Sequence, residues 1–164
     1  MFIQDGIVTR EMFEAKLPPA ERRAKGPYVI MECFQTIPCD PCTTSCKFGA
    51  VKDMDDINEI PQPIWDNCSG CARCVSACPG LACFIIDETY SEDKFSIKIP
   101  YEMFPLPSKG DTVQGVDRNG TPVTDAEVLA VLSNKGVDKT NVITLAVDKK
   151  YLYEVRSIKL KDNK

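Results

Sequence analysis

The chain contains no histidine and only one tryptophan among its 164 residues. The missing imidazole excludes Rieske-type ligation, a histidine-containing zinc site and a Ser-His-Asp triad. It also removes the side chain whose ordinary pKa best suits general base catalysis at neutral pH. Neither G-x-G-x-x-G nor G-x4-G-K-[ST] occurs, so no dinucleotide or nucleotide loop is indicated. We therefore expect little catalytic chemistry from this chain alone.

Long apolar runs are also missing, since no stretch of the sequence approaches the roughly 20 residues that span a membrane. The first residues, Met1 to Gly6, carry an acid in place of the positive charge that opens a secretory signal sequence. Nine cysteines in a chain without such a signal favour a reducing compartment over a disulfide framework. We therefore expect a soluble, cytoplasmic protein with no membrane span.

Positive charge is in deficit, with 20 lysines and arginines against 24 acids and a net charge of −4. Binding to nucleic acid needs the opposite balance, so no nucleic-acid partner is expected. A positively charged protein partner could be steered toward the chain. The most concentrated acidic run, Asp53 to Glu59, is interpreted as a solvated loop in preference to a docking patch.

Cysteine is abundant, and four cysteines form a C-x2-C-x2-C-x3-C-P run that ends at Pro79: Cys68, Cys71, Cys74 and Cys78. This spacing is typical of a loop that wraps a cubane iron–sulfur cluster. Three thiolates two residues apart can bind three corners of a cluster only if the loop bends tightly around it. In two-cluster proteins the fourth cysteine ligates the other cluster, so a second cysteine set is expected.

The second set lies upstream with the spacing C-x5-C-x2-C-x3-C: Cys33, Cys39, Cys42 and Cys46. Its last two gaps match those of the downstream run. The first gap is longer, five residues in place of two, and Lys47 stands where proline would follow the fourth cysteine. Because a longer first loop containing Pro38 can still deliver a distant thiolate, this set is also predicted to bind iron.

Zinc is the main alternative, because paired C-x2-C units also make four-sulfur structural sites. Such a metal would act as a structural staple of a non-redox interaction module. A tetrahedral zinc site has no use for an unbroken run of three cysteines followed by C-x3-C-P. The spacing therefore favours iron–sulfur chemistry at both cysteine sets.

The region from Val29 to Asp87 resembles the bacterial ferredoxins that carry two [4Fe–4S] clusters. In that family the ligand sets cross over. The resemblance implies one cluster bound by Cys33, Cys39, Cys42 and Cys78. It implies a second cluster bound by Cys68, Cys71, Cys74 and Cys46. Paired antiparallel strands close the family's fold, and the apolar runs 28–31 and 83–86 are expected to supply them, with 64–66 as a further strand.

Cys83, the ninth cysteine, falls where the family usually has an aliphatic residue. Free cysteine is among the most buried residue types and packs as a small hydrophobe. We interpret Cys83 as a buried side chain and not as a ligand. Four aromatic side chains near the cysteine sets are expected to form an apolar cover: Phe34, Phe48, Trp65 and Phe84.

The predicted fold class is α+β, in three parts. Residues 1–27 form an N-terminal arm with a helix over 9–17 that Thr9 caps. Residues 28–87 form the ferredoxin-like two-cluster domain. Residues 88–164 form a small, cysteine-free, β-rich docking domain, for which a compact barrel is one candidate form.

The expected strands of the tail follow alternating or β-branched patterns over residues 95–99, 113–116, 121–123, 141–147 and 151–158. Asn119 and Gly120 predict a hairpin turn between the second and third of these. Residues 124–127 also fit a helix capping box, so the stretch 125–132 is ambiguous between helix and strand. The β-branched Val128 and Val131 favour a strand.

The segment from Pro27 to Cys42, with its long first gap, has a closer resemblance. It looks like the small iron–sulfur subunits of multi-subunit, flavin-dependent dehydrogenases of proline, hydroxyproline, sarcosine and related secondary amines. The resemblance implies a hetero-oligomer in which FAD-bearing partner chains oxidise the amine and this chain, without FAD, passes electrons onward. The alternative is a free-standing ferredoxin that serves several oxidoreductases.

Overall fold

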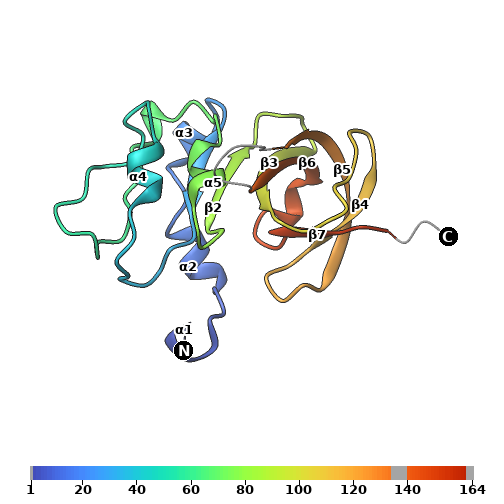
Figure 1. The fold of residues 1–164 in the computed structure, drawn as a ribbon. Helices are drawn as coiled ribbons and strands as arrows, with labels where there is room; N and C mark the ends of the chain where they lie inside the picture. The colour runs from blue at the N-terminus through green and yellow to red at the C-terminus, as the bar shows by residue number, and fades with distance from the viewer. Residues whose placement is uncertain (1, 134–139, 162–164) are drawn as a thin grey trace.

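Seven antiparallel strands form one continuous sheet, with the order β1-β2-β3-β6-β5-β4-β7 (Figure 1). The computed structural model describes residues 2–133 and 140–161. Its strands are β1 (Tyr28–Met31), β2 (Cys83–Asp87), β3 (Lys94–Tyr101), β4 (Thr112–Val116), β5 (Pro122–Leu132), β6 (Asn141–Asp148) and β7 (Ser157–Lys159). The sheet curls so that β7, at one edge, contacts β3.

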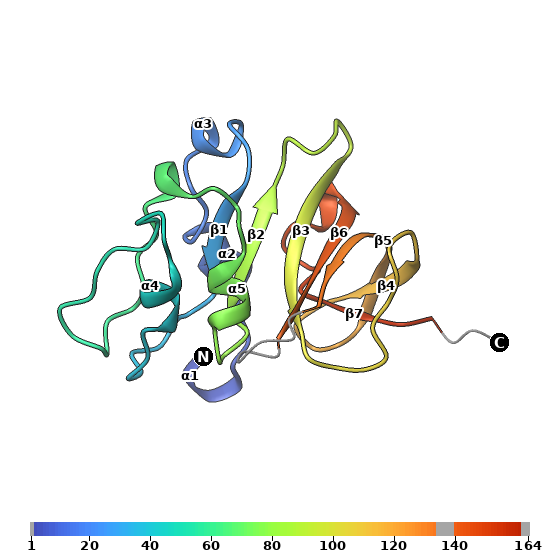
Figure 2. The ribbon, with the colours of Figure 1, turned by 45° about the horizontal axis from the view of Figure 1, so that its top comes forward.

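The helices are short, with three to five residues each. They are α1 (Phe2–Asp5), α2 (Arg10–Glu14), α3 (Ala20–Arg23), α4 (Pro41–Ser45) and α5 (Arg73–Ala77), with two 3-10 turns, η1 (Trp65–Asn67) and η2 (Lys149–Tyr151). Helices α4 and α5 lie toward the β1–β2 end of the sheet, and β4, β5 and β7 lie toward the other end (Figure 2). No helix in these ranges is long and apolar enough to cross a membrane.

The predicted α+β, ferredoxin-like fold class is wrong, because the chain is β-rich and built on this one sheet. Strand β2 uses one edge to pair with β1 and the other to pair with β3, where Ile86 lies opposite Ile97. Hydrogen bonding of β2 to β3 satisfies an edge that a separate ferredoxin-like unit would have left open. The sheet therefore runs through the position at residue 87 where two domains were expected to meet.

Most of the individual strand predictions are confirmed. The runs 28–31 and 83–86 pair antiparallel in β1 and β2, and 95–99 lies inside β3. The hairpin around Gly120 joins β4 to β5, and the ambiguous stretch 125–132 belongs to β5. Thr9 caps α2 by accepting a hydrogen bond from the Met12 amide, although the helix is shorter than predicted.

Two strand predictions are wrong. Residues 64–66 lead into the 3-10 turn η1, where the Trp65 indole N–H donates to the Val29 carbonyl at 3.0 Å. Residues 151–156 form turns and irregular backbone, with the Glu154 amide donating to the Tyr151 carbonyl, and only Ser157 and Ile158 of this predicted strand belong to β7. In both places side-chain contacts with the core produce an apolar pattern without an extended backbone.

Alternation along β1 and β2 divides the interior into two apolar clusters, because successive side chains of a strand point to opposite faces. Tyr28, Ile30, Phe84 and Ile86 belong to the main core, with side chains of β3 to β7. Their neighbours in sequence, Val29, Met31, Cys83 and Ile85, belong to a second cluster that contains the cysteines Cys42 and Cys74. The β1–β2 ribbon thus separates the sheet core from the cysteine region.

The N-terminal arm is packed against both regions. Phe13 of α2 is 2% exposed and its ring lies 5.6 Å from that of Tyr153, whose hydroxyl donates to the Val8 carbonyl. Arg23 of α3 forms an ion pair with Glu88 just after β2. The arm therefore connects the start of the chain to the last turns before β7.

Candidate functional site

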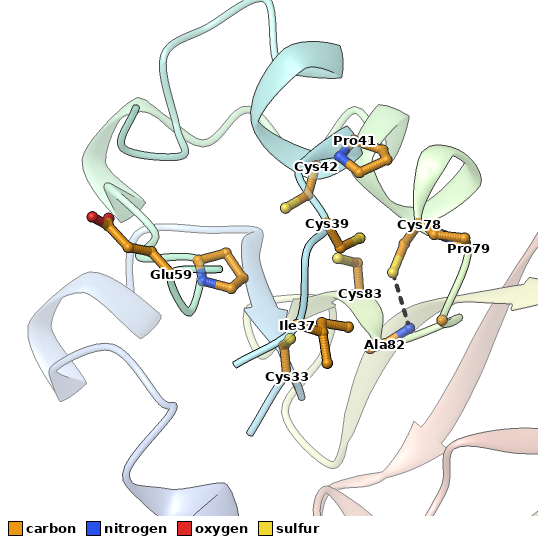
Figure 3. Close-up of a pocket in the computed structure, with 12 residues that line it drawn as sticks. Cys33, Ile37, Cys39, Pro41, Cys42, Glu59, Cys78, Pro79, Ala82 and Cys83 are labelled. Atoms are coloured by element: carbon orange, nitrogen blue, oxygen red, sulfur yellow. Dashed lines mark hydrogen bonds between the residues drawn. The ribbon is translucent and has the colours of Figure 1, made fainter. Parts of the chain in front are cut away.

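Five cysteines line one cavity of about 90 Å³ at the start of α4 and the end of α5: Cys33, Cys39, Cys42, Cys78 and Cys83 (Figure 3). Ile37, Glu59 and Pro79 also border this cavity, which we call the first pocket. Cys33 and Cys39 lie in the loop between β1 and α4, and Cys42 lies within α4. Cys78 follows α5, so it joins three cysteines from a distant part of the sequence.

The other four cysteines line a smaller cavity of about 20 Å³, the second pocket: Cys46, Cys68, Cys71 and Cys74. Phe48 and Arg73 also border it. Cys46 follows α4, and the Ala50 amide donates to its sulfur at 3.2 Å. Cys71 is exposed, whereas Cys74 in α5 is buried.

The loop that carries Cys68 and Cys71 has a tightly turned backbone. Gly70 has φ +72° and Ala72 has φ +67°, the left-handed conformation that glycine tolerates best. The loop is held by two cations, since Arg22 Nη2 donates to the Cys68 carbonyl at 3.2 Å and Lys98 Nζ donates to the Gly70 carbonyl. These contacts fix the bend that the cysteine spacing predicts.

Helix α5 brings the two pockets together. Cys74 faces the second pocket and Cys78 faces the first, and the Cys78 amide donates to the Cys74 carbonyl at 3.1 Å. Four residues of helix correspond to a rise of about 6 Å. Val75, which is fully buried, lies between them. Cys74 and Cys78 therefore lie about one helical turn apart.

Cys83 connects the pockets in a way that the sequence analysis missed. Its burial was predicted correctly, since it is 2% exposed. Its thiol can donate to one sulfur at a time, and this hydrogen bonding lowers the pKa of Cys78 to about 6 and also lowers the pKa of Cys74. The pKa of Cys83 itself is raised by the same hydrogen bonds. The sequence did offer a signal for this role, because Cys83 lies only five residues after Cys78, in a predicted strand beside the cysteine cluster.

Removing the Cys83 thiol is expected to make Cys78 less reactive. Cys83→Ala should raise the pKa of Cys78 from about 6 and slow its alkylation by iodoacetamide at pH 7 roughly tenfold, because the thiolate is the reacting species. Peptide mass spectrometry of the reduced protein measures the rate. Cys83→Ser, which keeps a donor, should largely restore it, and exposed Cys71 should react equally in all variants. An unchanged rate for Cys78 in Cys83→Ala would contradict this role.

The other thiols of the first pocket have a different environment. Burial raises the pKa of Cys42 to about 11, and burial also raises the pKa of Cys39. The expected aromatic cover is only partly present: Trp65 packs against the second cluster, whereas Phe84 belongs to the main core on the other face of β2 and Phe48, beside the second pocket, is 52% exposed. The acidic run 53–59 is an exposed loop, except for half-buried Met54.

The prediction of two [4Fe–4S] clusters is wrong for this structure. Within residues 2–133 and 140–161, no group of three or more cysteine or acidic side chains could hold a metal ion. Bordering one cavity is a weaker condition than ligation, which requires sulfurs to converge to about 2.3 Å from one metal. The second pocket, at about 20 Å³, has room for about one water molecule, whereas a cubane has eight atoms. The residues as arranged do not fit the group.

All eight cysteines predicted as ligands are thus found around two pockets, as free thiols. The grouping places Cys78 with the upstream set and Cys46 with the downstream set. Their roles as ligands stay a prediction. The chain matches no protein-family model and no solved structure, so the resemblance to iron–sulfur subunits rests on the cysteine pattern alone.

Proposed function

We propose that this protein is an electron-transfer subunit of a multi-subunit, FAD-dependent dehydrogenase of amino acids or secondary amines. It relays electrons between flavin sites, or from a flavin to an acceptor, and does not itself oxidise the substrate. The redox chemistry is assigned to the cysteines of the two pockets. The proposal keeps the relay of the family that the sequence resembles and does not retain that family's pair of [4Fe–4S] clusters.

The observation that carries the proposal is the sorting of eight cysteines into two pockets. Each pocket takes three cysteines from one sequence set and one from the other, with Cys78 and Cys46 exchanged. Two separate thiol sites are what a stepwise relay needs.

The closeness of the pockets also supports a relay. Cys74 in α5 borders the second pocket, Cys78 directly after α5 borders the first, and the Cys83 thiol interacts with both. A reduced flavin on a partner chain returns to FAD by giving up two electrons. A disulfide formed by two cysteines of one pocket takes up that electron pair with two protons and becomes two thiols, and a disulfide of the other pocket then accepts the pair by thiol–disulfide exchange.

Exposed apolar side chains beside the pockets favour a partner protein. Ile37, which borders the first pocket, is 45% exposed, and Phe48, which borders the second, is 52% exposed. Large exposed apolar groups gathered at a site are typical of interaction surfaces. We place the complex in the cytoplasm, where a reducing environment keeps such thiols free.

The test is an anaerobic purification of the tagged protein from its native cells, with iron, acid-labile sulfide and flavin quantified and co-eluting chains identified. We expect flavin-bearing chains to co-purify, and secondary amino acids to reduce the cysteine subunit within that complex. A lone monomer that undergoes reversible reduction would instead support the free-standing ferredoxin. A protein with no reversible reduction would exclude both.

A further inference from the structure

Glu32, the residue immediately before Cys33, is bound by two arginines. Its side chain is 7% exposed. Arg118 Nε donates to Oε2 at 2.8 Å, and both Arg118 Nη2 and Arg156 Nε donate to Oε1. Burial alone would raise the pKa of Glu32, but the hydrogen bonds and charges of the two arginines lower it. The carboxylate is therefore held charged in the interior.

Both arginines belong to the β-rich tail and are themselves anchored there. Arg118 lies in the β4–β5 hairpin turn, and its Nη1 donates to the Tyr153 carbonyl at 2.7 Å. Arg156 precedes β7, is 4% exposed, and donates through Nη1 to the Leu152 carbonyl at 2.9 Å. The positions of both guanidinium groups are thus set by the backbone of the tail.

Aromatic rings fix the same groups from the other side. The Arg156 guanidinium lies 4.9 Å from the Phe13 ring of the arm and 5.4 Å from the Phe84 ring of β2. Arg118 lies 4.7 Å from the ring of Tyr153. Arg156 Nη2 is buried without a hydrogen-bond partner. Cation–π contacts with Phe13 and Phe84 therefore stabilise the charge of this guanidinium in place of that hydrogen bond. Arm, cysteine segment and tail all meet at this cluster.

The backbone of Glu32 reaches the first pocket directly. Its amide donates to the Ala82 carbonyl at 2.8 Å, and the Ala82 amide donates to the Cys78 sulfur at 3.4 Å (Figure 3). The next residue is Cys33, which borders the same pocket. The loop of the second pocket is held by other cations, Arg22 and Lys98.

We propose that Arg118, Glu32 and Arg156 are positioning residues through which the β4–β5 turn and the segment before β7 set the first cysteine pocket, whereas the loop of the second pocket is held separately by Arg22 and Lys98. The tail, expected from its sequence to be only a docking unit, thereby becomes part of the cysteine site. The proposal is independent of electron transfer, because it concerns the order of the segment that carries the thiols.

Amide hydrogen exchange of the full chain tests this. In Arg118→Gln, exchange at Glu32 and Cys39, whose amides donate to Ala82 and Ile57, should become about tenfold faster, since a hydrogen bond to a buried charge is lost. Exchange at Cys68 and Val75, beside the second pocket, should stay unchanged. The readout does not depend on metal content or activity.

Arg10→Gln is the matched control. Arg10 also lies 4.7 Å from the Tyr153 ring and pairs with Glu154 of the tail, but it does not contact Glu32. It should change neither pocket. If Arg118→Gln does not fold, Arg118→Lys gives the same comparison, because lysine keeps the positive charge but cannot make the bidentate hydrogen bonds to Glu32. Equal acceleration beside both pockets, or none beside the first, would overturn the proposal.

Discussion

Gly70→Ala should lower the free energy of unfolding by about 3 kcal/mol, through left-handed strain and overpacking together. Gly70 has φ +72°, and an added Cβ would lie 2.7 Å from Cβ and 2.8 Å from Cγ of Pro27. The proline ring is rigid and connects the arm to β1, so it cannot move aside without shifting the strand. Urea denaturation measures the change.

Gly120→Ala separates the two causes. Gly120 has a similar φ of +79° but no atom within 4 Å of an added Cβ, so its cost should be the left-handed strain alone, about 1 kcal/mol. The difference between the variants is the contact with Pro27. Because Gly70 lies between Cys68 and Cys71, its variant should also alter alkylation of Cys71, which Gly120→Ala should leave unchanged. Equal losses of stability in the two variants would show that the contact costs nothing.

The strands were the most predictable part of the fold. Phe95, Ile97 and Ile99 alternate with polar residues in the sequence, and all three are fully buried in β3. Such alternation places every second side chain on one face only if the backbone is an extended strand. The strand predicted from Tyr151 onward was wrong, because the side chains of Tyr151 and Tyr153 pack against the core although their backbone forms turns. Sequence pattern records which side chains are buried and not the backbone path that buries them.

The fold class could not be predicted because it depends on one pairing. Strand β2 pairs with β3 through Ile85–Lys98, Ile86–Ile97 and Asp87–Ser96, and no local sequence pattern announces that these two strands are neighbours in one sheet. The cysteine spacing correctly indicated a tightly bent loop, in which Gly70 and Ala72 have positive φ. It could not give the distances between sulfurs, since these depend on how the long loop from Cys33 to Cys39 packs.

The Glu32 cluster was equally inaccessible from sequence, because its members are separated by 86 and 124 positions. Single charged residues in β-rich sequence are usually exposed. Only the arrangement of the hairpin turn and the last strand brings two guanidinium groups to one carboxylate. Such long-range polar contacts help to select one arrangement of the strands and turns among those that the apolar pattern alone allows.

Glu32→Ala is therefore expected to cost about 3–5 kcal/mol at pH 7, because it leaves buried arginine charge uncompensated. Arg156, at 4% exposure, cannot recover hydration. Glu154→Ala removes a carboxylate from a more exposed pair with Arg10, so it should cost no more than about 1 kcal/mol. Urea denaturation of both variants provides the comparison.

The charge dependence of the Glu32 cluster adds two checks. Because the folded-state pKa of Glu32 lies below its ordinary value of 4.5, the stabilisation is complete above that pH and is lost as pH falls through the lower folded value. The gap between wild type and Glu32→Ala should therefore narrow only in acid. In the double variant Glu32→Ala/Arg156→Ala the loss should be smaller than the sum of the single losses, since no unpaired Arg156 remains. Strict additivity, or a gap that is the same at pH 7 and pH 3, would contradict an electrostatic role for the cluster.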